Sequence, residues 1–341
     1  MNVTFVALRS LVFASGFLWL WAWAVRLLRP LDGVLGGPLP EWSRGAGLPV
    51  LAFAKSRKRR KHPAPFLVRY ATGIRDRVRS MRWLFVFAAL AAPLSAQLPA
   101  PNESGVSMGH VHLMVADPDE QKKLWVGVLG AEVTHTGSLE MLKLPGIFIV
   151  VGKARTPPAE GSEGSTVNHI GFLVKSYAEM KAKLTAAKLE LTSDNANTKQ
   201  LMVNFPDKVK VEFTEDAAIK VPIALHHIHN SSTDPEKLRA WYVKTFGAKP
   251  GTRGTFLAAM IPGGEVDFRK AQQPEAPTKG RSLDHIGFEV KNLEAFCQKL
   301  QADGITLDMA YRDVPQIGLK IAFLTDPDGT RIELTEGLAG H

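Results

Sequence analysis

The pattern of apolar and polar residues from residue 108 onward repeats four times. Each copy begins with a short apolar run that holds a histidine, at His110 to Val115, His169 to Val174, His227 to Asn230 and His285 to Val290. A stretch with helical spacing follows, and then three short stretches in which apolar and polar residues alternate. The pattern therefore predicts an α+β protein built from four βαβββ units, and their nearly constant spacing indicates an internal repeat.

The four copies are of two kinds. Copies one and three share a capped helix start, Asp117-Pro118 and Asp234-Pro235. Copies two and four share the sequence His-Ile-Gly-Phe instead, beginning at His169 and His285. The alternation predicts two domains, 108–219 and 220–341, each formed by two consecutive copies.

Charge is distributed unevenly along the chain. The net charge is +9, but residues 1–97 hold 15 Lys or Arg and 3 Asp or Glu, which leaves 27 basic and 30 acidic residues in the remainder. The repeats are therefore mildly acidic, and we expect no nucleic-acid partner. The single cysteine, Cys297, excludes an internal disulfide and thiolate zinc sites, and we interpret it as a small buried hydrophobe.

The first 80 residues contain an uncharged, mostly apolar stretch at 11–25, followed by a basic run at 55–61. One interpretation is that these residues form a transmembrane anchor followed by a basic cytoplasmic loop. The basic run could instead be a solvated, disordered tail. The other interpretation is that translation starts at Met81 and that residues 1–80 are a mis-called upstream extension.

Residues 81–96 resemble a secretory signal. Met81-Arg82 precedes an apolar stretch from Trp83 to Leu94, and a small residue, Ala96, stands before the expected cleavage site. Residues 97–107, rich in Pro, Asn and Gly, are predicted to form a linker. The repeats are accordingly expected outside the cytoplasm, periplasmic or extracellular, and anchored to the membrane if residues 1–80 are translated.

A carboxylate stands in a matched frame in the last strand of copies two and four. Glu212 lies in Val211-Glu212-Phe213 and Glu333 in Ile332-Glu333-Leu334. Copy three has Asp267 in a comparable frame, and copy one has Val150. Asp267 could be a fourth ligand, but an exposed carboxylate at the sheet edge is the simpler interpretation. A glutamate between apolar residues of a strand is costly to bury unless a group pairs with it.

These features resemble the vicinal oxygen chelate superfamily of glyoxalases, fosfomycin and bleomycin resistance proteins and extradiol dioxygenases. The resemblance rests on Asp326-Pro327-Asp328-Gly329 running into Ile332-Glu333-Leu334, with His285-Ile286-Gly287-Phe288 upstream, and covers roughly residues 108–337. It implies that two βαβββ modules form a half-open barrel. It also implies a divalent metal ion, Zn, Fe, Mn or Ni, held by His110, His169 and Glu212 in the first domain and by His227, His285 and Glu333 in the second.

His112 and His229 each follow an implied ligand by two residues and so share its face of the strand. Each is interpreted as a base, a substrate contact or an alternative ligand, with a hydrogen-bonded surface histidine as the simpler explanation.

Three functions compete on this basis. The first is an exported metal-dependent lyase, isomerase or epimerase whose small substrate chelates the metal through adjacent oxygens. The second is an extradiol-type dioxygenase, disfavoured because Phe323 and Met202 stand near the places where those enzymes carry a tyrosine. The third is a metal-free protein that binds a drug or metabolite. Metal identity, activity at one site or both, and a homodimer are left open by the sequence.

Overall fold

The computed structural model describes residues 98–158 and 160–341. The predicted anchor, basic loop and signal-like segment all fall within residues 1–97 and therefore lie outside the described residues. None of the described helices is long and apolar enough to cross a membrane. The predicted linker is described from Leu98, and its Asn102 side chain donates to the carbonyl oxygens of Phe246 and Gly247.

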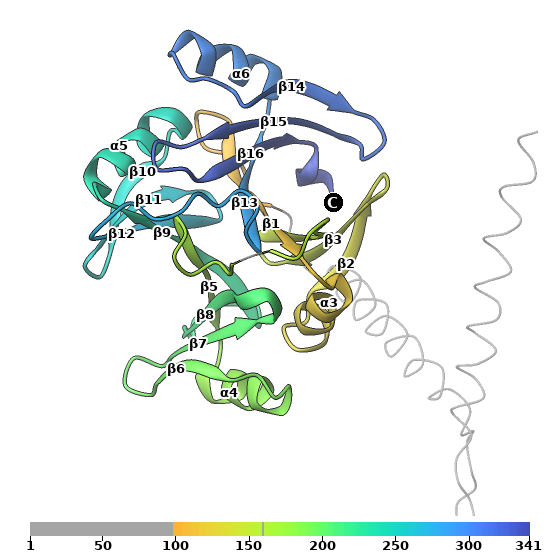
Figure 1. Ribbon diagram of the computed structural model, residues 1–341, viewed down its shortest axis with the longest axis vertical. Helices are drawn as coiled ribbons and strands as arrows, with labels where there is room; N and C mark the ends of the chain where they lie inside the picture. The colour runs from red at the N-terminus through yellow and green to blue at the C-terminus, as the bar shows by residue number, and fades with distance from the viewer. Residues whose placement is uncertain (1–97, 159) are drawn as a thin grey trace, which may run out of the picture. The chain divides into compact units, whose positions relative to one another are not determined.

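All four copies fold as βαβββ units, as the sequence predicts (Figure 1). Copy one comprises β1 (Val106–Val115), α3 (Pro118–Gly127), β2 (Glu132–Thr136), β3 (Leu139–Leu144) and β4 (Ile147–Lys153). Copy two comprises β5 (Val167–Val174), α4 (Tyr177–Ala186), β6 (Leu191–Asn195), β7 (Gln200–Phe205), the short 3-10 helix η1 (Pro206–Lys208) and β8 (Val209–Glu215). Copy three comprises β9 (Ile223–Ser232), α5 (Pro235–Phe246), β10 (Lys249–Arg253), β11 (Phe256–Ile261) and β12 (Gly264–Lys270). Copy four comprises β13 (Leu283–Val290), α6 (Leu293–Ala302), β14 (Met309–Val314), β15 (Leu319–Thr325), β16 (Arg331–Glu336) and the 3-10 helix η2 (Leu338–Gly340).

The helix starts are capped by the side chains that the sequence indicates. Asp117 accepts a hydrogen bond from the backbone nitrogen of Asp119, and Asp234 accepts one from Lys237. Each satisfies a backbone N–H that the first turn of a helix leaves unpaired. The caps therefore fix where each helix leaves the strand that carries the histidine.

The copies pair differently from the expected order. One eight-stranded sheet runs β14-β15-β16-β13-β1-β4-β3-β2 and joins copies one and four; the other runs β10-β11-β12-β9-β5-β8-β7-β6 and joins copies two and three. We call them the 1–4 sheet and the 2–3 sheet. We expected copies one and two to pair with each other, and copies three and four likewise. This expectation is wrong, because each sheet joins copies from both predicted domains.

Linker length gives a physical reason for this pairing. Residues 216–222 connect copies two and three, whereas the longer segments 154–166 and 271–282 connect the other neighbouring copies. The shortest connection joins two copies within one sheet, through the antiparallel pair β5 and β9. The longer ones cross between sheets.

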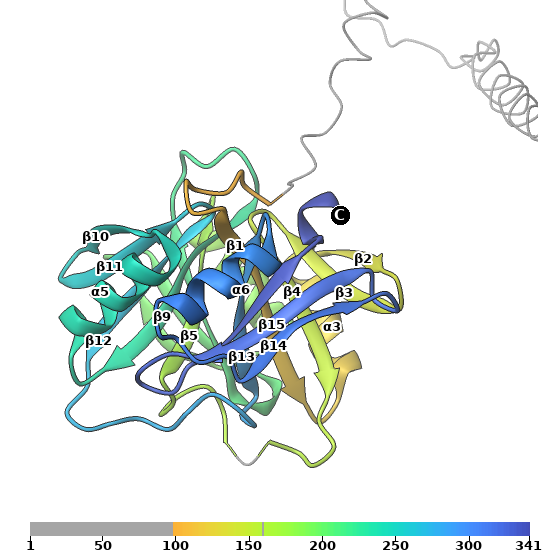
Figure 2. The same ribbon diagram turned by 90° about the horizontal axis from the view of Figure 1, so that it is seen from above.

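Consecutive copies are still joined, through their helix-facing sides. Trp125 of α3 is fully buried and its ring lies against Phe172 and Phe205 of copy two. Phe246 of α5 likewise packs against Phe288 and Phe296 of copy four. One apolar core thus spans all four copies. In the turned view, α6 still lies over the strands of the 1–4 sheet (Figure 2).

The 1–4 sheet curls so that the hairpins at its two edges touch. The backbone nitrogen of Ser138 donates to the carbonyl oxygen of Gln316, and the Thr136 hydroxyl donates to that of Ile317. A small apolar cluster, which includes Phe148 and Val150, lies apart from the main core. The curled sheet is a half-barrel with a concave inner face.

Candidate metal centre

The six implied ligands gather in two clusters. His110, His285 and Glu333 lie together on the 1–4 sheet, and His169, His227 and Glu212 lie together on the 2–3 sheet. We call them the 1–4 cluster and the 2–3 cluster. The grouping of His110 with His169 and Glu212, and of His227 with His285 and Glu333, is wrong because the strands that carry these residues pair across the repeat order.

A glycine makes each cluster sterically feasible. His110 pairs in register with Gly287, and His227 with Gly171. A Cβ atom at Gly287 would lie 2.1 Å from the His110 ring, and one at Gly171 would lie 2.0 Å from the His227 ring. The glycine of His-Ile-Gly-Phe therefore leaves room for the imidazole of the neighbouring strand.

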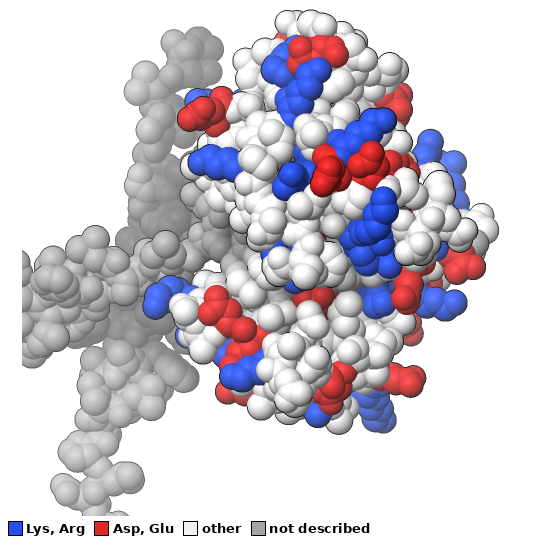
Figure 3. All heavy atoms as spheres, turned by 90° about the vertical axis from the view of Figure 1, so that its left-hand side faces the viewer, with Lys and Arg blue, Asp and Glu red and all other residues white. Residues whose placement is uncertain are grey.

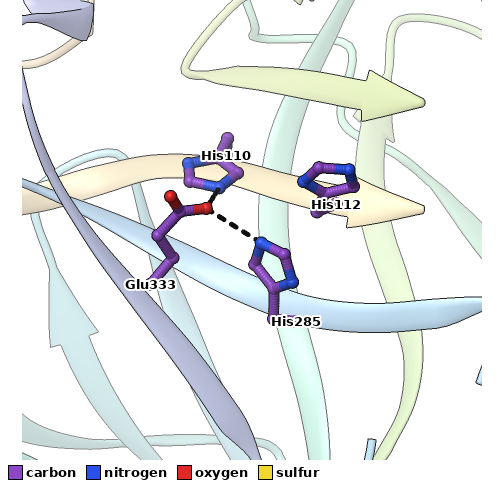
Figure 4. Close-up of side chains that lie close together, drawn as sticks. All are labelled: His110, His112, His285 and Glu333. Atoms are coloured by element: carbon purple, nitrogen blue, oxygen red, sulfur yellow. Dashed lines mark hydrogen bonds and ion pairs between the residues drawn. The ribbon is translucent and has the colours of Figure 1, made fainter. Parts of the chain in front are cut away.

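In the 1–4 cluster both imidazoles converge on one carboxylate oxygen. The Nε2 atoms of His110 and His285 each lie 2.9 Å from Oε2 of Glu333 (Figure 4). His112 extends from the same strand as His110, and its ring centroid lies 4.6 Å from that of His285. One ligand atom from each of these four residues lies within 4.8 Å of the others.

Asp284 orients His285 from behind. Its carboxylate lies 2.6 Å from Nδ1 of His285, and it is held in turn by the Arg331 guanidinium at 2.7 Å and the Gly280 backbone nitrogen at 2.7 Å. A carboxylate behind a histidine fixes which ring nitrogen faces the ligand position. The sequence analysis did not identify Asp284, although its place directly before His285 was a visible signal.

The cluster stabilises opposite charge states on its members. Burial favours the neutral form of Glu333, but hydrogen bonds from His110 and His285 outweigh it and hold the pKa of this carboxyl below its usual range. Burial also disfavours the charged form of His285, yet its bonds to Asp284 and Glu333 raise the pKa of the imidazole. Burial lowers the pKa of His112 to about 3, with a further contribution from the nearby His285. His112 is therefore neutral at pH 7.

The 2–3 cluster has the same residue types, but Nε2 of His227 lies 3.8 Å from Oε2 of Glu212, so only His169 is at hydrogen-bond distance from the carboxylate. Nε2 of His169 lies 3.0 Å from Oε2 of Glu212 and 3.2 Å from Nε2 of His227. The ring of His229 stacks on that of His169, with centroids 4.6 Å apart. Asn168, at the position matching Asp284, lies 2.9 Å from Nδ1 of His169. The residue behind this histidine is thus a neutral amide.

An arginine side chain fills the centre of the 2–3 cluster. Nη2 of Arg253 lies 3.1 Å from Nε2 of His227 and 3.3 Å from Nδ1 of His229, while Nε donates to Asp267. Asp267 is fully buried, so its interpretation as an exposed edge carboxylate is wrong. The sequence gives no local signal for Arg253, because its contacts with His227 and His229 form only in the folded 2–3 sheet.

A cavity of about 510 Å³ opens at the 2–3 cluster. Its lining includes His169, His229, Glu212 and Arg253. Elsewhere the charged surface is mixed: on the face drawn in Figure 3, basic and acidic side chains are interspersed. Lys122 with Glu140 and Lys299 with Asp303 are examples of local ion pairs.

The donor atoms of the 1–4 cluster fit a divalent ion. Imidazole and carboxylate ligands suit Zn, Fe, Ni and Mn, and two histidines with one carboxylate leave coordination positions open. The nitrogen of His110 next to Glu333 is Nε2, so Nε2 of His110 would be the ligand atom.

Comparison with known proteins is consistent with this architecture. Residues 224–334 match the family model of the Glyoxalase/Bleomycin resistance protein/Dioxygenase superfamily. No curated protein matches the chain significantly. Glyoxalase I from Zea mays has a similar fold, with a TM-score of 0.55 and 14% identity over 68% of this chain and 92% of that one. A putative dioxygenase from Bacillus subtilis gives a TM-score of 0.53 and 16% identity over 72% and 88% of the two chains.

Those two structures show the fold alone at such low identity. The family match covers copies three and four, and the repeat extends the same βαβββ unit to copies one and two. Copies three and four therefore match the Glyoxalase/Bleomycin resistance protein/Dioxygenase superfamily over residues 224–334, and copies one and two share their βαβββ fold.

Proposed function

We propose that this protein is a divalent-metal-dependent, glyoxalase-like lyase, isomerase or epimerase that acts on a small substrate with two adjacent oxygens. His110, His285 and Glu333 of the 1–4 cluster hold the ion. The observation that carries the proposal is the convergence of both Nε2 atoms on one oxygen of Glu333, at 2.9 Å each. When bound, the ion would supply Lewis-acid stabilisation of negative charge on a substrate oxygen.

The protein groups around the ion have separate roles in this proposal. His112 stands beside His285, with ring centroids 4.6 Å apart, so it is placed to contact a substrate bound at the ion. Asp284 keeps Nδ1 of His285 engaged and directs Nε2 towards the ligand position. Burial of His110 and His285, which are 3% and 4% exposed, keeps bulk water away from the ligand atoms.

A specific contact disfavours the dioxygenase alternative. Phe323 stands directly across from Glu333 in the β15–β16 pair, and its ring lies edge-on to His285 at 5.2 Å. A tyrosine hydroxyl, which the resemblance implies near this place in extradiol enzymes, is replaced by a ring without a donor. Oxygen uptake with a catechol would nevertheless identify a dioxygenase.

We also propose that the protein is exported, and this part of the proposal is based on the sequence alone. The signal-like residues 81–96 predict a mature chain that starts at Gln97. N-terminal sequencing of the protein recovered from the producing cell tests this directly. A chain that retains Met81 would contradict it.

Elemental analysis of the purified full chain tests the metal site. We expect bound divalent metal in the wild type and its loss in His285→Ala and in His110→Ala. A panel of 2-oxoaldehydes and α-hydroxy ketones, assayed for isomerisation and for exchange of the carbon-bound proton, then tests the reaction class. A wild-type chain without metal that binds small molecules would contradict the enzyme and favour the metal-free binding protein.

A further inference from the structure

The two clusters differ most in the side chains that surround them. The strand pairing shows which residues of copies one and three occupy equivalent positions. In copy one, His110 pairs with Phe148 and His112 with Val150. In copy three, His227 pairs with Glu265 and His229 with Asp267. At the hairpins, Thr136 and Arg253 each form the last pair before the turn. Copy one therefore has a threonine and two apolar residues where copy three has a cation and two carboxylates.

The three charged residues of copy three form one unit. Nε of Arg253 donates to Asp267 and lies 3.5 Å from Oε1 of Glu265. Both carboxylates are buried, at 0% and 7% exposure. Buried carboxylates of this kind are costly unless a cation pairs with them, so they hold the guanidinium in place.

Arg253 directs its N–H groups at the nitrogens that would bind an ion. A guanidinium only donates, so Nε2 of His227 and Nδ1 of His229 must offer it their lone pairs. A divalent ion needs the same lone pairs. It would also stand beside a fixed positive charge, because Nη1 of Arg253 lies 3.9 Å from Glu212, the carboxylate of this cluster.

We infer that Arg253 is the residue that selects between the clusters: it takes the place of the ion in the 2–3 cluster, so the chain binds one metal ion, in the 1–4 cluster. The inference depends on the proposed function only in assuming that the 1–4 cluster binds an ion. The 2–3 cluster keeps three histidines, His169, His227 and His229, with one ligand atom each within 4.8 Å of the others, and Glu212 lies 3.0 Å from His169. A side-chain cation stands where an ion would bind them.

Metal stoichiometry of the full chain tests the inference. The wild type, Arg253→Thr and Arg253→Lys are dialysed against Zn²⁺ or Ni²⁺, desalted and measured by elemental analysis. Arg253→Thr copies Thr136 of the 1–4 cluster and should bind one ion more than the wild type. Arg253→Lys keeps the positive charge and should match the wild type.

Two histidine variants assign the ions to their clusters. His285→Ala in the wild-type background should remove the single ion, and His227→Ala should leave it. In the Arg253→Thr background His227→Ala should remove the additional ion. If Arg253→Thr does not fold, judged by circular dichroism, the triple variant Arg253→Thr, Glu265→Phe and Asp267→Val replaces the whole charged unit with the residues of copy one.

Each outcome separates this inference from the proposed function. Two ions in the wild type, or no gain in a folded Arg253→Thr or triple variant, overturn the role of Arg253. No ion in the wild type with one in Arg253→Thr overturns the proposed function and leaves the role of Arg253 intact. No ion in either protein overturns both.

Discussion

The 1–4 cluster and the 2–3 cluster share a backbone register and differ in charge. In both, a histidine faces the glycine of a neighbouring His-Ile-Gly-Phe strand, and a glutamate from the last strand of the same copy completes the set. The 1–4 cluster has Phe148 and Val150 beside its histidines, whereas the 2–3 cluster has Glu265, Asp267 and Arg253. Equivalent histidines and glutamates thus stand in an apolar setting in one cluster and in a charged setting in the other.

The turns that precede Glu333 and Glu212 also differ in polarity. Asp326 is buried, accepts hydrogen bonds from the backbone nitrogens of Asp328, Gly329 and Thr330, and accepts another from the Tyr242 hydroxyl. The matching residue in copy two is Phe205, which packs on Trp125 instead. Glu333 is therefore positioned by a polar turn, and Glu212 by an apolar contact.

The largest expected difference between the clusters follows from removing their carboxylates. Glu333→Gln should weaken metal binding on the order of 10³-fold, since an anionic ligand contributes several kcal/mol to such a site. Glu212→Gln should leave the metal content unchanged. Titration with Zn²⁺ by calorimetry measures both, and equal losses would show that the clusters are equivalent.

A pH profile separates the two turns. Burial raises the pKa of Asp326 to about 6, so its contribution to stability is fully present below pH ~4 and is lost as the pH rises through about 6. Asp326→Asn keeps the acceptor oxygen and cannot ionise. Between pH 4 and pH 7 its free energy of unfolding should fall by about 2–3 kcal/mol less than that of the wild type. Urea unfolding at the two pH values measures this, and parallel profiles would contradict it.

Exchanging the residues behind the histidines should have a smaller effect. Asp284→Asn should reduce metal affinity about 10–100-fold, the usual cost of losing the carboxylate behind a ligating histidine. Asn168→Asp, the reverse change in the 2–3 cluster, should leave the stoichiometry at the wild-type value while Arg253 is present. A second ion in Asn168→Asp would show that the neutral amide, and not Arg253, distinguishes the clusters.

The two glycines provide the mildest test. Gly287→Ala and Gly171→Ala each place a methyl group against a buried histidine ring, so each should cost about 1–3 kcal/mol of unfolding free energy. Only Gly287→Ala should also weaken metal binding, because it displaces His110. Thermal unfolding with and without Zn²⁺ measures both effects. A metal-dependent shift that is equal in both variants would contradict the asymmetry.

Local pattern was enough to predict the units of this fold. The alternating strands and the Asp-Pro helix starts depend on residues close in sequence, and the structure contains them where expected. The structure also brings the six histidines and glutamates named from the sequence together in two clusters.

Which copies pair could not be derived from those patterns. His110 fits the glycine of either His-Ile-Gly-Phe strand, so copy one satisfies the same local rules beside copy two or copy four. The short linker 216–222 was a usable signal, but it favours one pairing only when all four copies are considered together. The ligand sets were therefore grouped incorrectly although every member was named.

The sequence by itself determined the repeat, the βαβββ units and the residue types of two clusters, because strand periodicity and helix capping act over a few neighbouring positions. Tertiary structure decided that copy one meets copy four, that Asp284 stands behind His285, and that Arg253 enters the 2–3 cluster. These depend on contacts between residues far apart in the chain, where linker length, burial and charge pairing act together.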